Sequence, residues 1–86
     1  MTDVNGIELK NGMIVRWKRD DDKTFPLTSY ARIINDCIDT NTNTIIVSVL
    51  KPYYDGDFIG ESLPKFGRNL MALSEIDQFI LSLELL

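Results

Sequence analysis

The sequence has no histidine and only one cysteine, Cys37, among its 86 residues. Histidine is the side chain that most often acts as a general base near neutral pH, so its absence excludes Ser–His and Cys–His nucleophile pairs. One thiol forms no internal disulfide and, without histidine, builds no zinc site. We therefore expect a non-enzymatic protein without metal or other cofactor, in the reducing cytoplasm, with Cys37 as a small buried hydrophobic residue.

Long apolar runs and excess positive charge are also missing. No stretch approaches the roughly 18 apolar residues that cross a bilayer, and the N-terminus lacks the pattern of a signal peptide, so we expect no membrane association. Nine basic and thirteen acidic residues give a net charge of -4 and a sequence pI near 4.6. This acidic balance argues against binding to free nucleic acid.

What the sequence does contain is typical of one small folded domain. Hydrophobic residues make up 44% and charged residues 26% of the chain, which are ordinary values for a globular protein. A chain of 86 residues is too short to divide into two ordinary domains, and no break in composition divides it. We expect a single domain over residues 1–86 with a small core.

The clearest strand signal follows the pair Asn11-Gly12, which predicts a tight turn. After it, an apolar set alternates with a mixed, basic set: Met13, Val15 and Trp17 against Ile14, Arg16 and Lys18. A period of two residues is typical of a strand with one buried face. The pattern predicts that Trp17 enters the core and that the basic side chains face water.

Residues 3–15, DVNGIELKNGMIV, resemble the opening of many small phage and mobile-element proteins. In those proteins an NGKEIKVGDKV-type sequence begins an SH3-like β-barrel. Asn11 and Met13 stand where that pattern favours valine and aspartate. The resemblance implies an all-β fold, a five-stranded SH3-like barrel with one short helical turn before the last strand. It implies no fixed activity.

Further strands are expected where β-branched and aromatic residues cluster between turn signals, over 29–38, 45–50 and 69–73, with 58–61 as an optional short strand paired with the third. Alternation fails at Asn35 and Asp36, so a bulge is expected there. The polar segment 39–44 is expected to be a hairpin loop, residues 63–69 another loop, and residues 1–4 a frayed lead-in.

The spacing of apolar residues in the C-terminal tail fits both a helix and a strand. As a helix capped by Ser74, it places four residues on one face: Ile76, Phe79, Ile80 and Leu83. As a strand, it places another four on one side: Phe79, Leu81, Leu83 and Leu85. Because the strand gathers every leucine of the tail except Leu86, we expect one helical turn at 74–77 and a closing strand over 78–85.

An aromatic and acidic rim is the first candidate binding surface. It consists of loop residues: Tyr53, Tyr54, Asp55, Asp57, Phe25, Asp20, Asp21 and Asp22. Tyrosine is favoured in interfaces because one rigid side chain offers both apolar area and a hydrogen bond. The rim predicts a module that recruits or inhibits a host or phage protein. The alternative is that some of these rings only cap the core.

Two other functions remain open. Basic side chains on an outer strand face, Arg16, Lys18 and Arg32, would suit a nucleic-acid or ribonucleoprotein accessory. A leucine-rich edge at the C-terminus, with Leu81, Leu83, Leu85 and Leu86, would suit a structural protein that pairs with a second copy as a homodimer.

Overall fold

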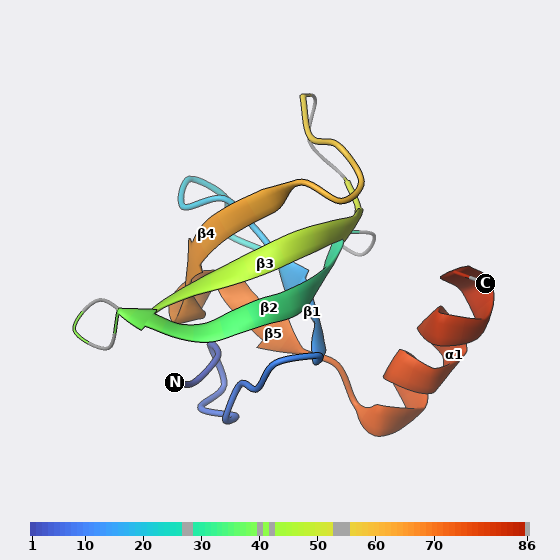
Figure 1. Ribbon diagram of the computed structural model, residues 1–86, viewed down its shortest axis with the longest axis horizontal. Coiled ribbons are helices and arrows are strands. Elements are labelled where there is room, and N and C mark those ends of the chain that lie inside the picture. Colours follow the sequence, from blue (N-terminus) through green and yellow to red (C-terminus); the bar gives the residue numbers. More distant parts are fainter. Residues whose placement is uncertain (27–28, 40, 42, 53–55, 86) are drawn as a thin grey trace.

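The computed structural model describes residues 1–26, 29–39, 41, 43–52 and 56–85. These residues form one antiparallel sheet with the strand order β4-β3-β2-β1-β5, followed by one helix (Figure 1). The elements are β1 (Ile14–Trp17), β2 (Tyr30–Asp39), β3 (Thr44–Lys51), β4 (Ser62–Phe66), the 3₁₀ turn η1 (Gly67–Asn69), β5 (Leu70–Ala72) and α1 (Glu75–Leu85). The predicted mainly β fold with five strands is confirmed.

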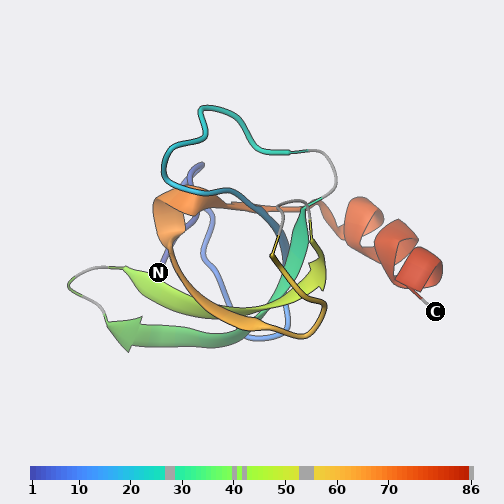
Figure 2. The ribbon, with the colours of Figure 1, turned by 90° about the horizontal axis from the view of Figure 1, so that it is seen from above.

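The sheet curls around its own core, as the view in Figure 2 shows. Its register shifts between Ile33 and Asn35 and again between Asn35 and Asp39, which confirms the irregularity expected in this strand. Such shifts bend a strand and increase its twist. At the start of the chain, Gly12 has φ +90°, as the predicted Asn-Gly turn requires.

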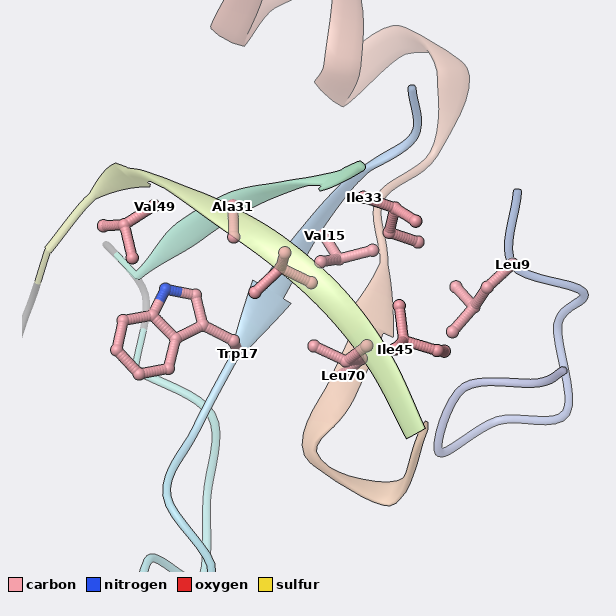
Figure 3. Packing of buried hydrophobic residues seen from close by; sticks show 9 residues of the cluster. Leu9, Val15, Trp17, Ala31, Ile33, Ile45, Val49 and Leu70 are labelled. Atoms are coloured by element: carbon pink, nitrogen blue, oxygen red, sulfur yellow. The ribbon is translucent and has the colours of Figure 1, made fainter. Parts of the chain in front are cut away.

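The main core fills the concave side of the sheet (Figure 3). It contains nine buried residues: Leu9, Val15, Trp17, Ala31, Ile33, Ile45, Val47, Val49 and Leu70. Trp17 is only 1% exposed, so the prediction that its indole lies in the core is confirmed. Seven of the nine are alternate residues of β1, β2 and β3, as a period of two requires.

A second, smaller cluster joins α1 to the opposite side of β1. Ile14 alternates with the core residue Val15 and packs with Leu73 and Leu81, and Tyr30 and Leu50 lie against this group. Leu81, which is buried in this cluster, attaches the helix to the sheet. Among the described residues, no helix has the length and apolar character needed to cross a membrane.

The strand expected over 78–85 is wrong, because these residues belong to α1. Ser74 begins the helix: its Oγ accepts a hydrogen bond from Asp77 N at 3.2 Å, and its carbonyl accepts one from Gln78 N at 2.9 Å. The expected placement of Leu81 and Leu83 on one side also fails, because Leu81 is buried and Leu83 is exposed.

Two further expectations are wrong. Residues 58–61 form a turn, in which Gly60 has φ +85° and donates its N–H to Val49 O at 2.7 Å. The fourth strand lies instead at Ser62–Phe66, where a loop was expected, and Pro64 pairs with Ile46. β4 is an end strand of the sheet, a position where proline's missing donor is tolerated.

The N-terminus is tied into the fold and is not a frayed lead-in. Asp3 is buried, and its carboxylate accepts three backbone hydrogen bonds of 2.8 Å, from Asn5, Ile7 and Ala72. Val4 N also donates to Leu70 O at 3.0 Å. One acidic side chain therefore holds the first turn and joins it to β5.

Candidate protein-binding surface

Four of the nine large apolar side chains that are exposed in the described part of the chain lie on α1. Ile76, Phe79, Ile80 and Leu83 are 72%, 66%, 49% and 57% exposed. Their spacing of three, four and seven residues places all four on one face of a helix. We call these four residues the α1 stripe. The helical interpretation of the tail had grouped the same residues, although the strand was preferred.

The stripe faces away from the sheet because the opposite side of α1 is attached to it. At about 100° per residue, Leu81 and Gln78 fall on the side of the helix opposite the stripe. Leu81 is buried, and Gln78 bridges two backbone groups: its Oε1 accepts from Ile14 N at 3.4 Å, and its Nε2 donates to Leu73 O at 2.9 Å. These contacts fix which face of α1 meets solvent.

The charged residues described beside the stripe are acidic. Glu75 and Asp77 lie in the first turn of α1, where carboxylates interact favourably with the helix dipole, and both are exposed. The helix sequence contains no lysine or arginine. At about 100° per residue, these two carboxylates fall on either side of Ile76. The surface is thus an apolar stripe with an acidic residue on each flank.

The predicted aromatic and acidic rim is only partly visible. Tyr53, Tyr54 and Asp55 lie outside the described residues. Asp57 is a largely buried side chain with Arg19 Nη2 at 3.8 Å from its Oδ1. Phe25 is half-buried, with Lys18 Nζ 5.8 Å from the centre of its ring. Neither Asp57 nor Phe25 presents a fully exposed binding group.

The three adjacent carboxylates, Asp20, Asp21 and Asp22, lie in the turn after β1 and differ in their surroundings. Asp20 Oδ1 accepts hydrogen bonds from Asn69 Nδ2 at 2.6 Å and from Arg68 Nη2 at 3.3 Å. The bond from Asn69, aided by the charge of Arg68, holds the pKa of Asp20 below its ordinary value. Asp21 is exposed and Asp22 is half-buried.

Lys65 lies over the buried indole, a placement that the sequence did not indicate. Its Nζ is 4.6 Å from the centre of the Trp17 ring, in the range of a cation–π contact. Burial lowers the pKa of Lys65, and the nearby carboxylate of Asp57 partly opposes that shift. Because β4 was not predicted, no pattern placed Lys65 beside Trp17.

The three basic residues proposed for nucleic acid all make contacts within the protein. Lys18 Nζ donates to Asp22 O at 2.9 Å and to Asn69 Oδ1 at 3.3 Å, so it turns toward the loop. Arg32 Nη1 donates to Gly12 O at 3.1 Å. The Arg16 guanidinium lies 5.8 Å from the centre of the Tyr30 ring. These contacts spread the three charges over different local partners.

The part of the chain that the structure describes contains no detected cavity and no group of three or more potential metal ligands. Comparisons with protein-family models, with curated proteins and with solved structures found no match to this chain.

Proposed function

We propose that this chain is a non-enzymatic protein-binding module that uses the α1 stripe as its contact surface. The observation that supports the proposal is the exposure of four large apolar side chains on one face of an 11-residue helix. Contiguous exposed apolar patches of this kind mark interaction sites in small proteins. We further propose that the module is a cytoplasmic accessory protein that recruits or inhibits a host or phage protein, and the resemblance of residues 3–15 favours a phage or mobile-element type.

The aromatic and acidic rim is a second contact region of the same module. Within this rim, Asp21 is an exposed carboxylate, and it lies between Asp20 and Asp22 in the turn after β1.

The proposal is tested by affinity capture from a lysate of cells that naturally carry this protein. We expect a protein that is retained by the wild-type chain and lost with Phe79→Ser combined with Ile80→Ser. The matched control is Ile59→Ser, because Ile59 is 75% exposed but lies in the turn before β4. Equal recovery of every captured protein by all three baits would contradict the proposal, and Tyr53→Ala with Tyr54→Ala tests the rim in parallel.

A further inference from the structure

We infer that α1 inserts as a helix into an apolar groove of a partner protein whose rims carry lysine or arginine. This inference rests on the proposed function and adds the chemistry of the partner. Anchors spaced by three, four and seven residues are the pattern by which one amphipathic helix fills a groove. Figures 1 and 2 both show α1 standing out from the sheet at one end of the molecule, where a groove has access to it.

The area of the stripe favours a groove over a flat surface. Four side chains that are each about half exposed or more present on the order of 400 Å² of apolar surface. Stable interfaces bury about 800 Å² on each partner, so a contact restricted to the stripe falls short. A groove also covers the flanks of the helix and thereby adds the missing area.

The charges on the flanks of α1 determine which side chains are favourable at the rims of that groove. Glu75 and Asp77 are exposed on the two sides of the stripe, and the helix has no basic residue to neutralise them. A groove that encloses the helix brings its rims close to these carboxylates, where like charges are costly and basic side chains are favourable. The rims are therefore basic.

The same charges argue against two other occupants. If α1 paired with α1 of a second copy, both helices would bring only acidic flanks to the contact, and each chain has a net charge of -4. Helices that bind membrane surfaces carry lysine and arginine on their polar face, which α1 lacks. Neither α1 of a second copy nor a lipid surface matches the charge of this helix.

The main test uses the full chain as bait and a defined probe. The probe is a displayed helical-bundle scaffold with one apolar surface groove, whose rim positions vary among lysine, arginine, glutamate, serine and glutamine. Clones are kept if they bind the wild-type chain and fail to bind Ile76→Ser with Phe79→Ser. We expect lysine and arginine to be enriched at the rims of these clones relative to the unselected library.

A charge variant sharpens the test. Glu75→Gln with Asp77→Asn keeps the stripe and removes both flanking charges, so we expect the selected clones to bind it roughly tenfold more weakly. Rims without basic enrichment, or equal affinity for this variant, would overturn the groove chemistry and leave the proposed function intact. If no clone depends on the stripe, the proposed function itself fails.

Two further measurements test whether a second copy of the chain or a lipid surface covers the α1 stripe instead. Sedimentation equilibrium of the purified chain is expected to give a monomer, and phosphatidylcholine vesicles are expected not to retain it. A dimer that dissociates on Phe79→Ser, or vesicle binding lost with the same change, would overturn the inference by assigning the stripe to that occupant. Circular dichroism of each variant, with Ile59→Ser as control, checks that α1 remains folded.

Discussion

Single residues decide how the ends of this chain join its sheet. Asp3 is the clearest case, because one buried carboxylate receives N–H groups from its own turn and from β5. A sequence pattern cannot reveal this role, since aspartate near a terminus is ordinarily solvated. The energetic consequence follows from the loss of an acceptor that serves three partly buried hydrogen bonds.

Asp3→Ala removes the acceptor of all three backbone hydrogen bonds. We expect this change to lower the free energy of unfolding by about 1–3 kcal/mol, because three partly buried hydrogen bonds lose their acceptor. Asp3→Asn keeps one acceptor oxygen and should cost less. Urea denaturation of the two variants and the wild type measures the difference, and an Asp3→Ala protein as stable as the wild type would contradict this role.

Lys65 offers a prediction about pH. Burial lowers its pKa below the 10.5 of an unfolded chain, so between the two values the unfolded state binds more protons than the folded state. The free energy of unfolding should therefore rise as the pH increases through that interval, and Lys65→Met should remove this rise. Asp57→Asn removes the opposing charge and should lower the pKa of Lys65 further, as NMR titration of the Lys65 side chain would show. A rise in that pKa would be contrary to the argument.

At the scale of elements, the sequence predicted the first strand well and the tail poorly. Asn11, Gly12 and the alternation up to Trp17 all favour the same structure, and the structure agrees with them. The tail fits both a helical and a strand pattern, and the strand is favoured only because it places every leucine except Leu86 on one side. The fold instead buries Leu81 and leaves the stripe in solvent, which the local pattern does not determine.

The fourth strand was missed for a similar reason. Pro64 stands in the middle of β4, and proline within a run ordinarily argues against a strand. Only the sheet order shows that β4 lies at an end, where the missing N–H costs little. The candidate surface was predicted in part: its four residues were grouped on one helix face, but their exposure depends on how α1 docks.

Leu81→Ala and Leu83→Ala form a matched pair that tests this docking. Leu81 is buried against Ile14 and Leu73, so its truncation should lower the free energy of unfolding by about 2–4 kcal/mol. Leu83 is 57% exposed, and its truncation should change stability by less than about 0.5 kcal/mol. Thermal or chemical denaturation separates the two results. Similar losses in both variants would indicate that the two leucines share a buried side.

The whole molecule combines a curved sheet around Trp17 with a helix held on the sheet's other side by a small cluster. That arrangement leaves one apolar helix face outward on an acidic domain, and the proposed protein contact depends on it. A small domain has little buried area to spare, so four large apolar side chains left in solvent are a cost to the isolated chain. Binding removes that cost.

The central claim is that the α1 stripe faces solvent in the free protein, and NMR with a soluble paramagnetic agent tests it most directly. The agent broadens signals of protons that it can approach. We predict strong broadening for the methyl groups of Ile76, Ile80 and Leu83 and for the Phe79 ring, with the Leu81 methyls protected to the same degree as those of Val15. Equal protection of the stripe and Leu81 would contradict the account.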